Sequence, residues 1–415
     1  MKLSSFLRLS SKTTNPQANP SVVYNLYSLP SFDEGRKCEV VHGSEIQSNK
    51  FVVPDKCILF NKLNVRFKRI WRINNNDPNK IASTEFLPLV VDESIVDFHY
   101  CYYLLRSDQI TDYLTGQNTN TSGSHKRIDP ENFFDIEVSL PPLDEQKRIG
   151  EVLSNLDKKI DVNTEINHYL EAMVKQLYDY WFVQFDFPDI NGKPYKSSGG
   201  KMVWNDKLKR EIPENWTNAT VVQVEKNIIT GKTPSTIIED NFGGPIPFVT
   251  IDDIRGNLHV YETARTLSTK GADTQKTKYL PKGSLCCSCI GTVGVLGFIG
   301  DIAQTNQQIN SIIFSKSFNK EYMYYTLQQH FIYSSAKTGN TILNMSKEEF
   351  ANIMILYPET SILQKYHNQC EPIFSQIDEN IKELNLLTKQ RNELLPLLMT
   401  GQVSVKQLNN DLSHD

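Results

Sequence analysis

The sequence has 415 residues, too many for one ordinary domain, and it predicts two or three. Hydrophobic residues make up 39% of the chain and charged residues 22%, which suits packed cores and excludes a highly charged disordered polymer. The formal net charge of −4 excludes a uniformly basic nucleic-acid binder, although it leaves room for a local basic surface.

Cysteine usage and hydropathy favour a protein of the cytoplasm. The 7 cysteines are an odd number without regular spacing, which argues against a disulfide framework. The N-terminal residues lack an apolar core of signal-peptide length. The longest apolar run, 285–300, is interrupted by glycines and is too short for a membrane-spanning helix. We therefore expect a soluble, cytoplasmic protein without a membrane partner.

The chain repeats itself, which indicates one unit of about 200 residues used twice. In the first copy and again in the second, the segments before a proline, 133–141 and 350–357, are typical of a short strand that the proline stops. The residues that recur at one constant spacing are Gly123, Phe134 and Pro142, and then Gly339, Phe350 and Pro358.

A long helical pattern follows each proline. Apolar residues alternate at steps of three and four from 149 to 181 and from 373 to 398, with Asn163 and Asn167 at seam positions of the first stretch. This period is typical of a coiled-coil seam, where asparagines fix the register. We therefore predict an intramolecular antiparallel helix pair rather than two unrelated surface helices. Pro372 and Pro396 are expected to kink or end the second helix locally.

These patterns predict an α+β protein with a pseudo-two-fold internal repeat, in which two long helices separate two globular α/β domains and form an antiparallel coiled coil. Acids outnumber bases in the helical stretches, so a polyanion would approach the globular domains. The expected bounds are 1–140 for the first globular domain, 141–185 for the first spacer helix, 186–202 for a linker, 203–358 for the second globular domain, 359–402 for the second spacer helix and 403–415 for a tail.

The strongest basic cluster is the segment 62–72, which holds five cations and no acid. Arginine reads guanine edges with paired hydrogen bonds, asparagine reads adenine edges, and lysine holds phosphates. A charge run of this length is often only a solvated strand end, but the density of arginine favours DNA contact. The candidate DNA-binding residues are Lys62, Asn64, Arg66, Lys68, Arg69 and Arg72.

The second half has a weaker equivalent, a Gly-Lys-Thr segment at 231–233 before a predicted strand at 247–251 and a polar loop at 270–278. It is no phosphate-binding loop, because Lys226 stands where the first glycine of that motif is required. The candidate DNA-binding residues here are Lys232, Thr233, Arg255, Lys276 and Lys278.

The sequence shows no signature of a catalytic or metal site, and we expect neither. The cysteines at 286, 287 and 289 lie in a predicted strand without a second pair or a histidine cluster nearby, so they are expected in the core and not on zinc. The glycines from 291 to 297 have the wrong spacing for dinucleotide binding and indicate a hairpin. The chain also lacks an Asn-Pro-Pro-aromatic element that would hold a flipped base.

Several long motifs resemble the specificity subunits of type I restriction-modification systems, and the resemblance spans nearly the whole chain. LPPLDEQ at 140–146 is similar to the start of the family's first spacer helix, and WFVQFDFP at 181–188 to its end. LLPLLMTG at 394–401 is similar to the end of the second spacer helix. Further similar segments are 123–128, 192–202, 31–35, 62–71 and 83–86.

The resemblance implies a DNA reader that catalyses no reaction itself. Each globular domain would be a target recognition domain for one half of a split double-stranded DNA target, and the helices would set the gap. Two methyltransferase subunits and restriction (motor) subunits would assemble on the chain. S-adenosylmethionine, ATP and Mg would belong to those partners, and no cofactor to this chain. The alternatives are a self-contained DNA-modifying enzyme with an unrecognised site, and an assembly scaffold that has lost DNA contact.

Overall fold

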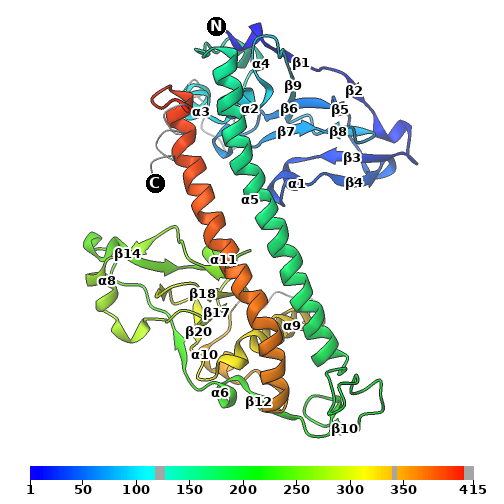
Figure 1. Ribbon diagram of the computed structural model, residues 1–415, viewed down its shortest axis with the longest axis vertical. Coiled ribbons are helices and arrows are strands. Elements are labelled where there is room, and N and C mark those ends of the chain that lie inside the picture. Colours follow the sequence, from blue (N-terminus) through cyan, green and yellow to red (C-terminus); the bar gives the residue numbers. More distant parts are fainter. Residues whose placement is uncertain (117–126, 339–343, 406–415) are drawn as a thin grey trace. The chain divides into compact units, whose positions relative to one another are not determined.

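Two long helices, α5 (Leu143–Tyr178) and α11 (Thr360–Met399), dominate the structure (Figure 1). The computed structural model describes residues 1–116, 127–338 and 344–405. Gly123, Gly339 and residues 406–415 of the expected tail lie outside the described residues. The chain divides into unit 1, Met1–Asp161 with Leu386–Asp415, and unit 2, Val162–Asn385. Each unit therefore contains part of both long helices.

The two helices pack against each other in antiparallel fashion within each unit. In unit 2, Asn163 donates from Nδ2 to Oε2 of Glu383 at 2.9 Å, and Asn380 donates to Oδ1 of the buried Asn167 at 2.8 Å. In unit 1, apolar residues of both helices share one core, which contains Ile149, Leu153, Leu394 and Leu398. The predicted antiparallel pairing is confirmed, with the asparagines at the seam.

Helix α11 differs from the prediction at its prolines. The sequence predicts a kink or an end at Pro372, and of these two the end is wrong: the helix continues through this residue and ends at Met399, three residues beyond Pro396. Pro372 is exposed, and the turns on either side bury Tyr366, Cys370 and Phe374 in the core of unit 2. Because a proline removes one backbone hydrogen bond, burial of the neighbouring apolar side chains offsets that loss.

Unit 1 contains two sheets. The first has the order β1-β9-β6-β7 and is antiparallel throughout, with the fully flanked strand β6 buried along most of its length. The second has the order β2-β5-β8-β3-β4. The strands are β1 (Leu7–Leu9), β2 (Thr13–Thr14), β3 (Val23–Tyr27), β4 (Glu39–His42), β5 (Lys50–Val52), β6 (Lys56–Asn61), β7 (Ile70–Asn74), β8 (Lys80–Ala82) and β9 (Phe86–Val91).

The helices of unit 1 before α5 are α1 (Leu29–Asp33), α2 (Phe98–Arg106), α3 (Asp108–Gly116) and α4 (Pro130–Phe134). The predicted strand at 133–141 is wrong in this copy, where Glu137 makes only an isolated bridge to Lys2. Asp129 caps α4 by accepting from the Glu131 backbone, and Pro130 starts the helix with its preset φ. A helix start therefore replaces the strand.

Unit 2 contains a five-stranded sheet of order β13-β20-β17-β18-β15, a three-stranded sheet of order β16-β14-β19, and the strand pairs β10-β11 and β12-β21. Here the strand before the repeated proline is confirmed as β21. The strands are β10 (Met202–Asn205), β11 (Arg210–Pro213), β12 (Thr217–Thr220), β13 (Ile228–Thr230), β14 (Phe242–Val249), β15 (His259–Val260), β16 (Thr266–Leu267), β17 (Leu285–Ser288), β18 (Leu296–Ile299), β19 (Gln304–Thr305), β20 (Ile309–Ile312) and β21 (Met354–Tyr357).

The shorter helices of unit 2 are α6 (Val221–Val224), α7 (Ile251–Ile254), α8 (Thr269–Asp273), α9 (Lys320–Thr338) and α10 (Lys347–Ala351). The strand predicted at 247–251 is β14, which begins earlier and stops before Thr250. Thr250 instead caps α7, donating from its backbone and its hydroxyl to the Asp253 carboxylate at 2.8 and 2.6 Å. This local side-chain competition ends the strand.

The predicted core position of the cysteine cluster is confirmed. Cys286 and Cys287 are fully buried in β17, which pairs with β18 as the predicted hairpin. Cys287 and Cys289 lie in one hydrophobic core of unit 2, and Cys286 lies in another. All seven cysteines are free thiols. Among the described residues, no group of histidines, cysteines and acids is arranged to hold a metal ion. Nor does the described part of the chain contain a helix apolar and long enough to cross a bilayer.

Candidate nucleic-acid interface

The basic segment of unit 1 forms the connection between β6 and β7, as a short turn followed by a strand. A 3₁₀ turn, Val65–Phe67, lies between Asn64 and Lys68, whose φ values of 53° and 45° are left-handed. Residues other than glycine rarely adopt this conformation unless their surroundings hold them there. Two anchors do so: the Val65 side chain is buried, and the Leu63 backbone donates to Oδ1 of Asn61 at 2.9 Å. The turn is therefore fixed at its base.

Three of the predicted residues on this turn remain accessible. Arg66 is exposed, and Lys62 and Asn64 are half-buried. Within the described part of the chain, the Arg66 guanidinium has no carboxylate partner. Arg66 therefore meets the requirement for a residue that contacts DNA, because its guanidinium can donate paired hydrogen bonds to a base edge or a phosphate without first leaving a carboxylate.

Lys68 and Arg69 are held by acids of their own unit. The Arg69 guanidinium donates two parallel hydrogen bonds to Asp33, from Nε at 2.7 Å and from Nη2 at 2.8 Å, and Lys68 pairs with Asp108. Both acids are well exposed, so these ion pairs contribute little, roughly 0–1 kcal/mol each. A phosphate could replace either acid at a small cost in free energy.

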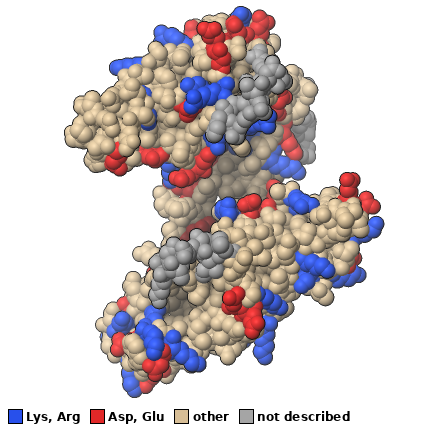
Figure 2. All heavy atoms as spheres, turned by 180° about the vertical axis from the view of Figure 1, so that it is seen from behind, with Lys and Arg blue, Asp and Glu red and all other residues tan. Residues whose placement is uncertain are grey.

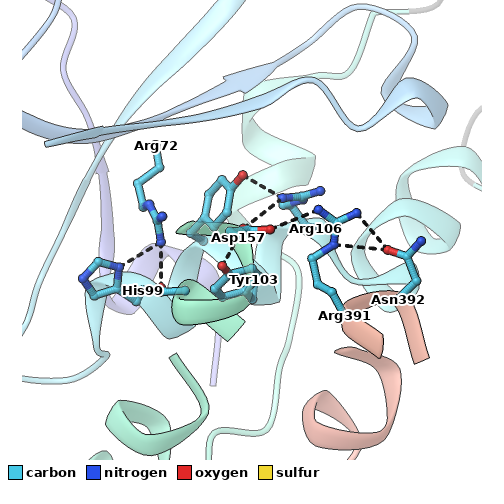
Figure 3. Close-up of polar contacts among 9 residues, drawn as sticks. Arg72, His99, Tyr103, Arg106, Asp157, Arg391 and Asn392 are labelled. Atoms are coloured by element: carbon cyan, nitrogen blue, oxygen red, sulfur yellow. Dashed lines mark hydrogen bonds and ion pairs between the residues drawn. The ribbon is translucent and has the colours of Figure 1, made fainter. Parts of the chain in front are cut away.

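Arg72 differs from the other cations because its side chain lies inside unit 1 (Figure 3). Its Nη1 is 2.9 Å from both Nδ1 of His99 and Oγ of Ser154, and its guanidinium stacks over the Tyr102 ring at 4.9 Å. Burial and the positive charge of Arg72 lower the pKa of His99, so the neutral imidazole accepts the hydrogen bond. Arg72 thus joins β7 to α2 and α5.

Asp157 of α5 is the centre of the adjoining polar cluster (Figure 3). It accepts from the Tyr103 hydroxyl at 2.6 Å and from Nη1 of Arg391, on α11, at 3.0 Å. Nη1 of Arg106 lies 3.8 Å from the same carboxylate. The carboxylate is only 10% exposed. The strand that follows the basic turn is thereby tied to both long helices within unit 1.

In unit 2, one buried glutamine brings two predicted segments together. Gln275 donates from Nε2 to the Lys232 carbonyl at 2.6 Å and directly precedes the 3₁₀ turn Lys276–Lys278. Lys232 and Lys276 are exposed, while Lys278 and Thr233 are half-buried. Sequence reasoning missed Gln275 because a single glutamine carries no periodic or motif signal. Lys270, Lys276 and Lys278 were expected on a loop, but they lie on α8 and on this turn.

The segment 231–233 is fixed by close packing. A Cβ at Gly231 would lie 2.1 Å from the Asn306 carbonyl oxygen, so no other residue fits without a shift of the backbone. The Thr233 hydroxyl donates to Oε1 of Gln307 at 2.7 Å. Arg255 lies elsewhere in unit 2: it follows α7, is exposed, and has Nη2 3.5 Å from the Thr292 hydroxyl of the β17–β18 connection.

Basic and acidic side chains are interspersed on the face shown in Figure 2. On this face the cations form local clusters rather than one continuous basic surface, in agreement with the small net charge of −4.

A family model described as the type I restriction modification DNA specificity domain matches residues 2–172 and 213–395. The chain therefore belongs to the family of type I restriction-modification DNA specificity proteins. The two matched regions also confirm the internal repeat. The predicted family and its role, that of a DNA specificity subunit, are thereby confirmed, and the comparisons give no support to a self-contained modifying enzyme.

Named relatives agree with this assignment, and a solved structure has a similar fold. The type I restriction enzyme HindI specificity subunit of Haemophilus influenzae is 27% identical over 418 residues, covering 88% of this chain and 91% of the relative. The MjaIX specificity subunit of Methanocaldococcus jannaschii is 25% identical over 336 residues, covering 80% and 74%. The crystal structure of the type I system S subunit from M. genitalium has a TM-score of 0.58 at 13% identity, covers 96% and 95%, and supports the fold alone.

Proposed function

We propose that the chain recognises a two-part double-stranded DNA target, one half with each target recognition domain, and catalyses no reaction itself. The observation that carries the proposal is the double family match, once in each half of the chain. Each matched half also contains its own anchored cluster of accessible cations, at 62–69 and at 232–278. Two separate readers on one chain suit a target with two separate halves.

The test is methylation-sensitive sequencing of a host that carries this chain with its partner subunits. We expect methylated adenine in a motif of two short halves around an unread gap. Replacement of residues 1–122 by the matching segment of a relative should change one half and leave the other. If the methylated motif stays the same after this replacement, the chain is an assembly scaffold and the proposal fails.

Within unit 1, we assign direct DNA contact to Lys62, Asn64 and Arg66, which are accessible on a fixed turn. Lys68 and Arg69 are assigned to phosphates, in exchange for their exposed acids. Arg72 is assigned a positioning role, since its guanidinium is committed to His99, Ser154 and Tyr102. The assigned residues of unit 2 are Lys232, Thr233, Lys276 and Lys278 as one cluster, and Arg255 as a separate contact.

The partners we propose are two methyltransferase subunits and restriction (motor) subunits. S-adenosylmethionine, ATP and Mg would bind to these partners, and no cofactor to this chain. Their expected compartment is the cytoplasm, where the host DNA lies. Purified chain with S-adenosylmethionine and target DNA should transfer no methyl group, and addition of the methyltransferase subunits should start the reaction. Methyl transfer by the chain alone would contradict the proposal.

A stripe of exposed apolar side chains on α5 supports docking of a methyltransferase subunit. Val162, Ile166, Tyr169 and Met173 are exposed and recur at steps of four, three and four, which places them on one helix face beside the seam. An apolar helix face of this kind is typical of a partner surface.

Ile166→Glu should therefore reduce co-purification of the methyltransferase subunit at least tenfold, because it places a charge in the buried part of that interface. His168→Glu is the matched control, since His168 is exposed on another face of the same helix. Equal recovery of the partner with both variants would exclude this surface as the docking site.

A further inference from the structure

Phe67 is a large apolar side chain that the basic turn of unit 1 leaves 62% exposed. Single exposed apolar residues are common and need no special role. Phe67, however, stands next to Arg66 on a turn whose two neighbouring residues, Asn64 and Lys68, are held in left-handed conformations. Backbone strain of this kind is retained where the surrounding structure enforces it, which is common at functional sites.

The Arg69 side chain also restrains the Phe67 ring in the free protein. The Arg69 guanidinium lies 4.8 Å from the ring centre, and Asp33 holds that guanidinium with two hydrogen bonds. These contacts restrain the Phe67 side chain before DNA binds, and the Arg69 guanidinium can stay over the ring when a phosphate takes the place of Asp33. An apolar ring that is already ordered loses little conformational entropy on binding.

The surroundings of the ring define the ligand that fits it. The neighbouring cations attract the phosphates of a DNA backbone. An aromatic ring held among these cations would then lie close to the bases of the same duplex. Proteins that bend DNA insert apolar side chains between base steps and partly unstack them. Base–aromatic stacking is available to every base because each has a π-face.

We propose that Phe67 inserts its ring into a base step of the first half-site and is a specificity-determining residue of that domain. The proposal rests on the proposed function, since it requires that the turn 62–69 faces DNA. Specificity would arise because base steps differ in the free energy needed to open them, so flexible steps accept the ring and stiff ones exclude it.

The experiment uses the full chain assembled with its methyltransferase subunits, without S-adenosylmethionine, and a duplex carrying the target found by methylation sequencing. The fluorescent base 2-aminopurine, which still pairs with thymine, replaces in turn each adenine of the first half-site and its flanking base pairs, on either strand, except the methylated adenine. The expected result is a rise in fluorescence at one step. Phe67→Ala should abolish this rise and weaken binding about 10- to 100-fold, the range given by loss of one base–aromatic contact.

Two variants make the result specific to the ring. Val40→Ala is the control: Val40 is 69% exposed on β4 but lies beside Glu39, away from the basic turn in sequence, so fluorescence and affinity should not change. Phe67→Trp should preserve the fluorescence signal, because it keeps a flat aromatic side chain at the same position. Its retained signal also shows that substitution at this position does not unfold the turn.

Three outcomes overturn the inference, and they are distinguishable from failure of the proposed function. If no step reports unstacking, or if Phe67→Ala keeps both signal and affinity while Arg66→Ala loses affinity, the turn faces DNA but the ring does not insert. If binding instead weakens only when a thymine of the first half-site is replaced by uracil, the ring contacts the thymine methyl group at the base edge and does not insert. If Arg66→Ala also binds normally and the motif survives replacement of 1–122, the proposed function itself fails.

Discussion

At the scale of single residues, arginines close together in sequence have different tasks, and this difference is testable. Arg66→Ala should leave thermal stability within about 0.5 kcal/mol, because the side chain is exposed. The same change should weaken target binding by about 1–3 kcal/mol if Arg66 reads a base, or lower the salt dependence by about one phosphate if it holds the backbone. Binding of the assembled complex, measured over a range of salt concentrations, separates the two cases.

Arg72→Ala is the internal comparison. It should lower the free energy of unfolding by about 1–3 kcal/mol, because His99 and Ser154 lose a charged hydrogen-bond partner. Sequence reasoning grouped Arg72 with Arg66 and Arg69, since all three are arginines of one basic run. The alternation of buried and exposed residues along a strand could not separate them, because the residues directly before and after Arg72 on β7 are both buried. Only the contact with α2 and α5 shows which face is covered.

The carboxylate of Asp157 makes a second prediction at this scale. Asp157→Ala should destabilise unit 1 by about 3–5 kcal/mol, because Arg106 and Arg391, each about 15% exposed, would lose their shared counter-charge. Chemical denaturation measures the change. In a double-mutant cycle with Arg391→Ala, the two effects should be clearly non-additive. Simple additivity would show that the two side chains do not interact.

At the scale of elements, the junction of β15 with α11 in unit 2 predicts a pH dependence. The His259 ring is 11% exposed, stacks on Phe298 and lies 3.4 Å from the Asp378 carboxylate. Burial lowers the pKa of His259 to about 4, against the smaller opposite effect of Asp378, and the nearby Lys282, Lys320 and Lys382 lower it further. The folded protein therefore binds this proton less readily than the unfolded chain does.

Because the folded pKa lies below the ordinary value, the stabilisation from neutral His259 is present above about pH 6.5 and is lost as the pH falls toward 4. Asp378, whose pKa the Tyr261, Lys282 and Lys382 hydrogen bonds lower to about 2 against the effect of burial, stays ionised in this window. His367, raised in pKa by its hydrogen bond to Glu321, acts in the opposite sense and loses its contribution as the pH rises.

Between pH 7 and pH 4, the free energy of unfolding should fall by about 2–3 kcal/mol less in His259→Phe than in the natural chain. The reason is that the substitution removes the group that must take up a proton. Thermal unfolding at several pH values measures the difference. His168→Phe, at an exposed position of α5, is the control and should follow the natural chain. Parallel curves for His259→Phe and the natural chain would show that the imidazole does not control this acid transition.

The elements also show where sequence patterns suffice. The heptads predicted both long helices and their antiparallel pairing, because a 3.5-residue period depends only on the order of apolar residues. Helix α11 does not end at Pro372, because burial of Tyr366 and Phe374 in the core outweighs the loss of one backbone hydrogen bond. The site in unit 2 was found only in part, because Gln275, which joins its two segments, is recognisable only after folding.

At the scale of the whole molecule, the two units differ in how the chain builds them. Unit 2 is one continuous stretch, Val162–Asn385, whereas the core of unit 1 is completed by residues 394–405 from the far end of the described chain. In unit 1, Leu398 and Val405 are buried with Ile149 and Leu153, and Leu394 packs against them. A chain that ends at residue 161 would leave the apolar face of α5 without this partner.

We therefore expect a fragment of residues 162–385 to fold by itself and a fragment of residues 1–161 to be unstable. Burial of roughly 25 cal/mol per Å² of apolar surface is lost when the second helix is missing, and a free apolar helix face promotes association. Addition of a peptide of residues 386–415 should restore a cooperative thermal transition to the 1–161 fragment. Circular dichroism measures this transition. A peptide with Leu394, Leu395 and Leu398 changed to Ser should fail to do so. An equally sharp transition without any peptide would mean that the first target recognition domain folds without α11, and that the helix pair stabilises only unit 2.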